Sequence, residues 1–346
     1  MDFKNYLVPG KTGLLIGIGG VSMSPLAEVL HDAGLDIRGS DMAESSNTLT
    51  LRERGIPIHI GHSADNVTDD ISFVIRTAAV HDDNPEVHEA HRRGIPVFER
   101  TQAWGALMRG YQNALCISGT HGKTTTTSMC THIMMAAEKD PTVMIGGTLP
   151  LLKACHRVGK GNTIIMESCE YYNSFLALNP TIAVVLNIEA DHLDFFKDLE
   201  DIKHSFRCFA ERVPAETGTV IANYDDANTM DALRGIARKV ITFGLNAKAD
   251  VYAQNIVHRG SVSEFDIYHR GNYFARVTLH VPGIHNVRNA LAATAAAIVL
   301  GVSPNAVKYG LAGFEGAGRR FDFKGKFQGA DLYDDYAHPV SYTHLT

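Results

Sequence analysis

The 346-residue sequence predicts an α/β protein with two domains, each built on a parallel sheet. Two observations support this prediction. Apolar runs of strand length alternate with segments of helical spacing along most of the chain, as in a parallel sheet that is covered on both faces. In addition, glycine-rich turns follow two of the apolar runs, at residues 17–20 and 119–122. A glycine turn between a strand and a helix is typical of nucleotide-binding folds.

The first domain is predicted over residues 1–110 and is Rossmann-like. An apolar run at residues 14–16 is followed by the glycine turn and by a helical pattern from Pro25 to Ala33, which ends at Gly34. Further strands are predicted at residues 35–37, 56–60, 73–75 and 95–98.

The first glycine turn resembles a dinucleotide-binding fingerprint. Gly17, Gly19 and Ser22 hold its three key positions, and Asp41 stands near the place of an acidic ribose ligand. Because the third glycine is replaced by Ser22, the pattern favours another diphosphate over NAD. A tight turn without a ligand, or an NAD-dependent oxidoreductase, remains an alternative.

The second domain is predicted over residues 111–317, with the apolar run 114–118 as the strand before the second glycine turn. Closely spaced short strands with turn signals between residues 251 and 281 predict an antiparallel β insertion. A long helix is expected at residues 286–300. The remaining strands are predicted at residues 163–166, 182–186, 219–222 and 240–243.

The second glycine turn indicates a phosphate-binding loop (P-loop) and therefore ATP and Mg²⁺. The turn is followed by Lys123, which can reach the terminal phosphates, and by Thr124, whose hydroxyl can ligate Mg²⁺. Only two residues separate Gly119 from Gly122, whereas the general pattern has four. The alternative is a helix start that is merely capped by threonines.

Carboxylate and imidazole groups follow two other predicted strands. Glu167 ends one strand, and Asp191 and His192 lie just beyond another. The carboxyl ends of parallel strands share one edge, so Glu167 and His192 are expected near the phosphates as Mg²⁺ ligands. Taken singly, each has a plainer interpretation: Glu167 as a surface charge, and His192 as an exposed residue beside Asp191, which would cap a helix. Asn286 and Asn289 share one helix face, although spacing alone favours a simple N-cap role for Asn286.

Composition excludes several classes of function. The net charge of −6 gives no basic field for nucleic acid. Five scattered cysteines without a Cys-x-x-Cys pair indicate reduced thiols rather than disulfides or a zinc site. The longest apolar run, residues 291–302, is too short for membrane insertion, and the N-terminus has no signal-peptide pattern. We therefore expect a cytoplasmic protein.

The C-terminal segment departs from this pattern. Residues 316–321 are predicted as a linker and residues 330–333 as the first strand of a third α/β unit, without a partner strand. We expect residues 318–338 to begin a truncated third domain, Rossmann-like and almost entirely missing. Residues 339–346 are expected to be an artefactual tail. If the chain is real as written, we expect a nucleotide-binding fragment with little or no catalytic activity.

Taken in order, the motifs resemble those of the Mur ligase family over nearly the whole chain. They are GIGG at 17–20 with GSD at 39–41, GTHGKTT at 119–125, ESCE at 167–170, NIEADHLD at 187–194, GIHNVRNA at 283–290, GRRF at 318–321 and DDYAH at 334–338. The short phosphate loop is this family's own form.

The resemblance implies roles for individual residues. Lys123 would bind the ATP phosphates, Thr124 and Glu167 would hold one Mg²⁺, and His192 a second. The other implied ATP-binding residues are Gly119, Thr120, His121, Gly122, Thr125, His285, Asn286, Asn289, Arg320 and Asp335. The first turn would bind a UDP-sugar rather than NAD, through Gly17, Gly19, Gly20, Ser22, Asp41, Thr77 and Ala78.

The implied reaction forms an acyl phosphate. The lactyl carboxylate of UDP-N-acetylmuramate would attack the γ-phosphate of ATP, and the amine of L-alanine would then displace phosphate. Another Mur-type ligase, such as one that recycles murein peptides, or a non-catalytic nucleotide-binding relative, is the alternative.

Overall fold

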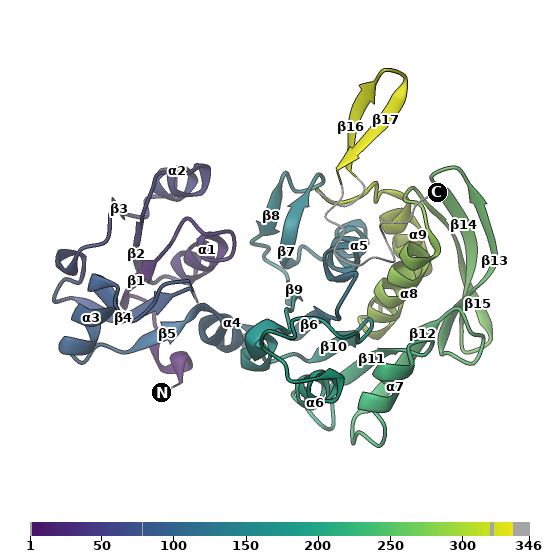
Figure 1. Cartoon of the computed structure of the whole chain (residues 1–346), viewed down its shortest axis with the longest axis horizontal. Helices are drawn as coiled ribbons and strands as arrows, with labels where there is room; N and C mark the ends of the chain where they lie inside the picture. The colour runs from purple at the N-terminus through teal and green to yellow at the C-terminus, as the bar shows by residue number, and fades with distance from the viewer. Residues whose placement is uncertain (1, 78, 319–321, 335–346) are drawn as a thin grey trace. The chain divides into compact units, whose positions relative to one another are not determined.

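The structure is a computed structural model that describes residues 2–77, 79–318 and 322–334. Its contacts divide the chain into two compact units. Unit 1 contains Met1–Tyr111 and Ala177–Asn179, and unit 2 contains Gln112–Leu176 and Pro180–Thr346. Each unit is built around its own sheet (Figure 1).

Unit 1 has a parallel sheet with the strand order β3-β2-β1-β4-β5. This is the order of a Rossmann-like half, so the predicted fold class is confirmed. Its central strand is buried throughout, as the apolar run indicated. The strands are β1 (Thr12–Ile16), β2 (Asp36–Asp41), β3 (Ile58–Ile60), β4 (Ile71–Arg76) and β5 (Val97–Glu99).

The helices of unit 1 begin where the sequence supplies caps. Ser45 and Thr48 form a capping box at the start of α2, and Asn84 caps α3, which has Pro85 at its first position. The helices are α1 (Ser24–Asp32), α2 (Ser46–Glu53), α3 (Pro85–Arg92) and α4 (Arg100–Met108), with the short 3-10 helices η1 (Phe3–Tyr6) and η2 (Ala64–Asn66).

Unit 2 has a sheet with the order β15-β14-β13-β12-β11-β10-β6-β9-β7-β8. Its middle strands are parallel, whereas β14, β15 and β8 pair antiparallel at the two edges. The strands are β6 (Asn113–Ser118), β7 (Thr142–Leu149), β8 (Ala154–Arg157), β9 (Thr163–Glu167), β10 (Ile182–Val185), β11 (Thr219–Asn223), β12 (Lys239–Gly244), β13 (Val251–Arg259), β14 (Val262–His269) and β15 (Asn272–Leu279).

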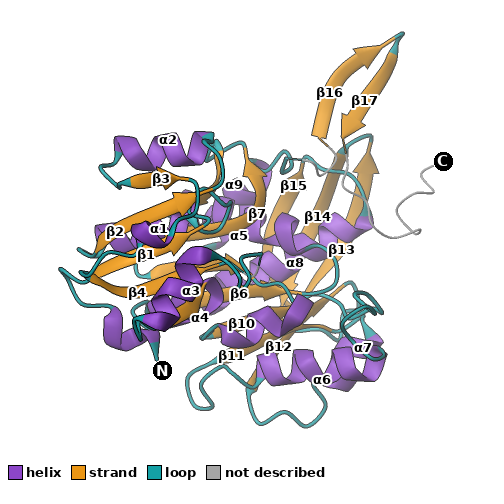
Figure 2. Ribbon diagram, turned by 60° about the vertical axis from the view of Figure 1, so that its left-hand side comes forward, coloured by secondary structure: helices purple, strands orange, loops and turns teal. Residues whose placement is uncertain are grey.

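The predicted antiparallel insertion is confirmed: β13, β14 and β15 lie side by side at one edge of this sheet (Figure 2). Strands β7 and β8 were not predicted. Gly146 and Gly147 interrupt the apolar pattern of β7, and the side chains of β8 are only partly buried, so neither segment reads as a strand.

Helices cover both faces of the unit 2 sheet (Figure 1). The predicted long helix is α8, whose alanine-rich sequence is buried on most sides because α5, α9 and the sheet surround it. No helix in the described part of the chain is both long and apolar enough to cross a membrane. The helices are α5 (Lys123–Ala136), α6 (Leu199–Ala210), α7 (Ala227–Ala232), α8 (Ile284–Val299), α9 (Pro304–Ala312) and the 3-10 segment η3 (Tyr171–Ala177).

The C-terminal strand prediction was wrong in one respect. Strand β17 (Ala330–Asp334) is not alone, because it pairs antiparallel with β16 (Asp322–Phe327) to form a hairpin. No strand was predicted at residues 322–327. The expected tail at residues 339–346 lies outside the described residues.

Helices α5 and α9 pack so closely that Gly310 is needed between them. A Cβ at Gly310 would lie 2.5 Å from the Cα of Ile133, a backbone atom that cannot rotate away. We predict that Gly310→Ala destabilises unit 2 by about 1–3 kcal/mol, the usual range for overpacking. Urea unfolding measures this loss. The neighbouring exposed Tyr309→Ala is the control, and equal stability of both variants would contradict the packing argument.

His132 on α5 makes unit 2 sensitive to acid. Its ring packs edge-on against Phe314, and burial lowers its pKa from 6.5 to about 4. Between these values the unfolded chain binds a proton that the folded chain does not, so stability falls as the pH drops from about 6.5 to about 4.

We predict that His132→Leu reduces this pH dependence by up to about 2 kcal/mol between pH 7 and pH 5, at 1.36 kcal/mol per pKa unit. The measurement is urea unfolding of both proteins at pH 7 and pH 5. Identical pH dependence in the variant and the parent protein would refute it.

Candidate functional site

The second glycine turn joins β6 to α5 in a conformation that needs glycine. Gly119 and Gly122 have φ values of +144° and +84°, where other residues are strained. Space is also limited, because a Cβ on Gly119 would lie 2.8 Å from the Cβ of Leu186. Gly122 is the N-cap of α5, so the first N–H groups of the helix face the turn. This is the geometry of an anion-binding loop.

Asn187, at the end of β10, holds the turn in place. Its Oδ1 accepts a 2.8 Å hydrogen bond from the backbone N–H of His121, and its Nδ2 donates to the His121 carbonyl at 3.0 Å. The Asn187 carbonyl also accepts from the N–H of Thr120 at 3.0 Å. No role for Asn187 was predicted from the sequence. Its position directly after a predicted strand, on the same edge as the turn, was the available signal.

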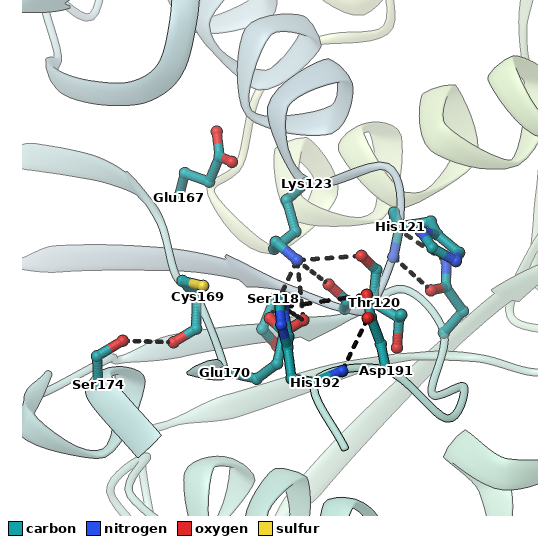
Figure 3. A network of polar contacts seen from close by, with 12 residues as sticks. Ser118, Thr120, His121, Lys123, Glu167, Cys169, Glu170, Ser174, Asp191 and His192 are labelled. Carbon is teal, nitrogen blue, oxygen red and sulfur yellow. Dashed lines mark hydrogen bonds and ion pairs between the residues drawn. The ribbon is translucent and has the colours of Figure 1, made fainter. Parts of the chain in front are cut away.

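Lys123 lies against the turn and pairs with Glu170 (Figure 3). Its Nζ donates to the carbonyls of Gly119 and Thr120 at 2.6 and 3.1 Å, and to the Glu170 carboxylate at 3.0 and 3.1 Å. The Glu170 side chain is only 3% exposed. A buried carboxylate of this kind needs a counter-charge, which Lys123 supplies. Glu170 was also missed from the sequence, although it lies in the ESCE motif.

Thr124 and Glu167 come together as the sequence predicted. The Thr124 hydroxyl donates to Oε1 of Glu167 at 2.9 Å, and the Gly146 N–H donates to Oε2 at 2.6 Å. Strand β9 pairs with β6, so the last residue of β9 faces the first turn of α5. A hydroxyl beside a carboxylate, both hard oxygen donors, fits a Mg²⁺ ion that also binds phosphate.

His192 lies with Glu170 rather than with Glu167. Its Nε2 is 4.0 Å from Oε1 of Glu170, and its ring stacks on Tyr171 at 4.3 Å. In Figure 3 the Glu167 carboxylate is set apart from this group. Among the described residues, no cluster of three or more His, Cys, Asp or Glu side chains is arranged to hold a metal by itself. Mg²⁺ ligation by His192 stays a prediction.

The start of α8 lies beside the phosphate loop. A Cβ on Gly122 would be 2.7 Å from Oδ1 of Asn289, and Asn289 donates to Oδ1 of Asn286 at 3.3 Å. The N-cap alternative for Asn286 is wrong, because Gly283 holds that position. Asn286 instead donates to the carbonyl of Pro282 at 2.7 Å. The ring of His285 lies close to Gly283.

Burial also sets the charge state of the turn. It lowers the pKa of His121, and the nearby Glu189 carboxylate opposes the shift only in part. The imidazole is therefore neutral at pH 7, and the positive side chain at this turn is that of Lys123.

The first glycine turn, in unit 1, is held by the end of β2. The N–H groups of Gly17 and Ile18 donate to the Ser40 carbonyl at 2.8 and 3.0 Å, and that of Gly19 donates to Oδ2 of Asp41 at 2.8 Å. Asp41 thus fixes the turn itself.

Three other residues predicted for this first turn lie at or beside it. Thr77 borders Gly17, Gly20 donates to the Gly17 carbonyl, and the Ser22 hydroxyl accepts from Arg100. The predicted residues Ala78, Arg320 and Asp335 lie outside the described residues.

Comparison with known proteins agrees with this geometry. The family model described as "Mur ligase family, catalytic domain" matches residues 15–112, and "Mur ligase middle domain" matches residues 117–297.

Curated relatives share this similarity. The UDP-N-acetylmuramate–L-alanine ligase of Agathobacter rectalis is 46% identical over 324 residues, which are 93% of this chain and 70% of the relative. That of Clostridium novyi is 45% identical over 98% of this chain and 73% of the relative.

Solved structures are similar as well. The UDP-N-acetylmuramate-alanine ligase MurC from Thermotoga maritima has a TM-score of 0.78 and 31% identity, covering 95% of this chain and 74% of the other. A UDP-N-acetylmuramate:L-alanyl-gamma-D-glutamyl-meso-diaminopimelate ligase from Neisseria meningitides has a TM-score of 0.80 and 26% identity. The match covers 90% of this chain and 100% of the other. Similarity of this extent, in sequence and in structure, shows that the chain belongs to the Mur ligase family.

Proposed function

We propose that this protein is an ATP-dependent ligase that joins L-alanine to the lactyl carboxylate of UDP-N-acetylmuramate, a step in building peptidoglycan precursors in the cytoplasm. The observation that carries the proposal is the arrangement at one sheet edge: a phosphate loop with Lys123 beside the Thr124–Glu167 pair. The names of the relatives supply the acceptor and the amino acid.

The reaction proceeds in two balanced steps. A lactyl carboxylate oxygen forms a bond to the γ-phosphorus of ATP, and the bond from that phosphorus to ADP breaks. The amine of L-alanine then attacks the acyl phosphate carbon, a C–N bond forms, a proton leaves the nitrogen, and inorganic phosphate departs. A carboxylate is a poor electrophile, and phosphorylation gives it a leaving group.

The residues of unit 2 mainly bind and orient. The N–H groups of the turn and the Lys123 ammonium hold the phosphate oxygens and spread the charge of the transferring group. Thr124 and Glu167 would hold one Mg²⁺, and His192 a second near the acceptor carboxylate. When bound, Mg²⁺ neutralises phosphate charge. Asn187 keeps the turn open for its ligand.

Other residues are proposed to bind the rest of the substrates. His285, Asn286 and Asn289 lie at the start of α8 and would contact the nucleotide and the neighbouring substrate. Arg320 and Asp335 would close over ATP. In unit 1, the first glycine turn with Asp41 and Thr77 would bind the UDP group.

A second candidate for the amine substrate is a peptide in place of L-alanine. The structure of the murein peptide ligase from Psychrobacter arcticus has a TM-score of 0.80 and 24% identity, so the fold does not separate the two activities. Both candidates share the acyl-phosphate step and differ only in the amine.

Substitution of Lys123 tests the phosphate site directly. Because a hydrogen bond to a charged group is worth about 1.5–3 kcal/mol, Lys123→Ala should weaken ATP binding about 10- to 100-fold. Isothermal titration calorimetry of the chain with MgATP measures the change. The exposed Lys160→Ala is the charge-matched control. If Lys123→Ala binds MgATP as tightly as the parent protein, the phosphate site is wrongly assigned.

A ligase assay of the full-length gene product tests the reaction. We expect phosphate release that requires UDP-N-acetylmuramate and L-alanine together, with L-serine and glycine as weaker amines. The tripeptide L-alanyl-γ-D-glutamyl-meso-diaminopimelate distinguishes the second candidate. ATP binding without turnover with any of these amines would contradict the proposed function and favour a non-catalytic relative.

A further inference from the structure

We propose that Glu86 is a positioning residue for the nucleotide site of unit 1, acting through Ser40 on the glycine turn at residues 17–20. The ligand is the diphosphate of a uridine nucleotide, and in this respect the inference rests on the proposed function. Glu86 itself would not touch the nucleotide.

The glycine turn takes its position from Ser40. The carbonyl of Ser40 accepts from both Gly17 and Ile18, the first two residues after β1. The next residue, Asp41, accepts from Gly19. Strand β2 also packs closely against the turn, because a Cβ on Gly39 would lie 2.3 Å from the side chain of Ile18. Any movement at the end of β2 therefore moves three N–H groups of the turn.

Ser40 is held in turn by Glu86. The Ser40 hydroxyl donates to Oε2 of Glu86 at 2.7 Å, and both residues are fully buried. The same oxygen is 2.8 Å from Nδ1 of His62, and Oε1 accepts from Nδ2 of Asn66 at 2.6 Å. An ionised carboxylate only accepts hydrogen bonds, so Nδ1 of His62 carries the proton in this contact.

These partners come from separate elements of unit 1. Ser40 lies in β2, His62 in the segment after β3, and Asn66 in η2, whereas Glu86 is the second residue of α3. The helix N-terminus favours a negative charge at that position. Glu86 thus links four segments to one another directly behind the turn.

Stability alone does not account for a buried carboxylate here. Desolvating a charge costs several kcal/mol, and well-packed apolar side chains of similar volume often stabilise a protein as much or more. The carboxylate instead orients Ser40, because its hydrogen bonds fix the angle at which Ser40 meets the turn. Accurate placement of backbone N–H groups is what binding of a diphosphate requires.

Glu86→Gln is the most direct test. The amide nitrogen can no longer accept, so either the Asn66 amide alone or both the Ser40 hydroxyl and His62 lose their partner, while the volume stays the same. We expect the dissociation constants of UDP and UDP-N-acetylmuramate to rise about 10-fold, as for about 1.4 kcal/mol, with MgATP binding unchanged. Isothermal titration calorimetry of the chain with UDP, UDP-N-acetylmuramate and MgATP measures the three dissociation constants.

Two further variants separate positioning from general loss of stability. Ser40→Ala breaks the same link but leaves the Ser40 carbonyl in place, so the double variant should bind no more weakly than Glu86→Gln alone. Glu89→Gln, on the same helix, breaks ion pairs with Arg92 and Arg93 away from the turn and should leave UDP affinity unchanged.

The outcomes are distinct. Failure of the parent protein to bind either uridine ligand overturns the ligand assignment and, with it, this part of the proposed function. If the parent binds but Glu86→Gln binds equally well, the positioning role is wrong. Equal weakening of UDP and MgATP binding also overturns it, because the effect is then general. Should Glu86→Gln not fold, unchanged UDP affinity in Ser40→Ala overturns the proposal.

Discussion

The candidate site of unit 2 depends on one constraint, the parallel pairing of β6 with β10 on one side and with β9 on the other. Because these three strands run in the same direction, the residues that follow them share one edge. Asn187 from β10 then clamps the phosphate loop, and Glu167 from β9 meets Thr124. The β10 side thus holds the loop, and the β9 side supplies a carboxylate beside the start of α5.

Unit 1 uses the same constraint with different chemistry. Its glycine turn also follows a central parallel strand and is clamped by the neighbouring strand, β2, through Ser40 and Asp41. Here, however, no lysine or threonine follows the turn, and the acidic side chain of Asp41 faces an N–H group. This difference fits the proposed roles of the two turns, one at a transferable phosphate and the other at a group that is only held.

Most of the fold was predictable, because long apolar runs with glycine turns report the strand–turn–helix units directly. Strand β7 was missed because paired glycines, Gly146 and Gly147, break its pattern. The neighbouring Glu167 explains why glycine stands at position 146, since a Cβ on Gly146 would lie 2.6 Å from one of the Glu167 carboxylate oxygens. The hairpin partner β16 was missed although only residues 328–329 separate it from β17, because Gly325 interrupts the strand pattern of residues 322–327.

The candidate site was predictable where strand order alone brings residues together, as for Thr124 and Glu167. Glu170 was not, because it lies three residues beyond the end of β9, where strand pairing does not place it against Lys123. The segment that follows, η3, is irregular: Tyr172 and Asn173 adopt left-handed conformations, with φ values of +52° and +55°. Asparagine is common in this conformation but tyrosine is not, so this bend was not predicted. Asn286 was ambiguous for a similar reason, since capping depends on which residue starts the helix.

The most direct measurement of the central claim follows the oxygen atoms of the acceptor. UDP-N-acetylmuramate labelled with ¹⁸O in both lactyl carboxylate oxygens is turned over by the full-length gene product with ATP and the amine. The released phosphate is then examined by ³¹P NMR. Formation of an acyl phosphate at the Lys123 loop predicts one ¹⁸O atom in each phosphate. Unlabelled phosphate would contradict the account.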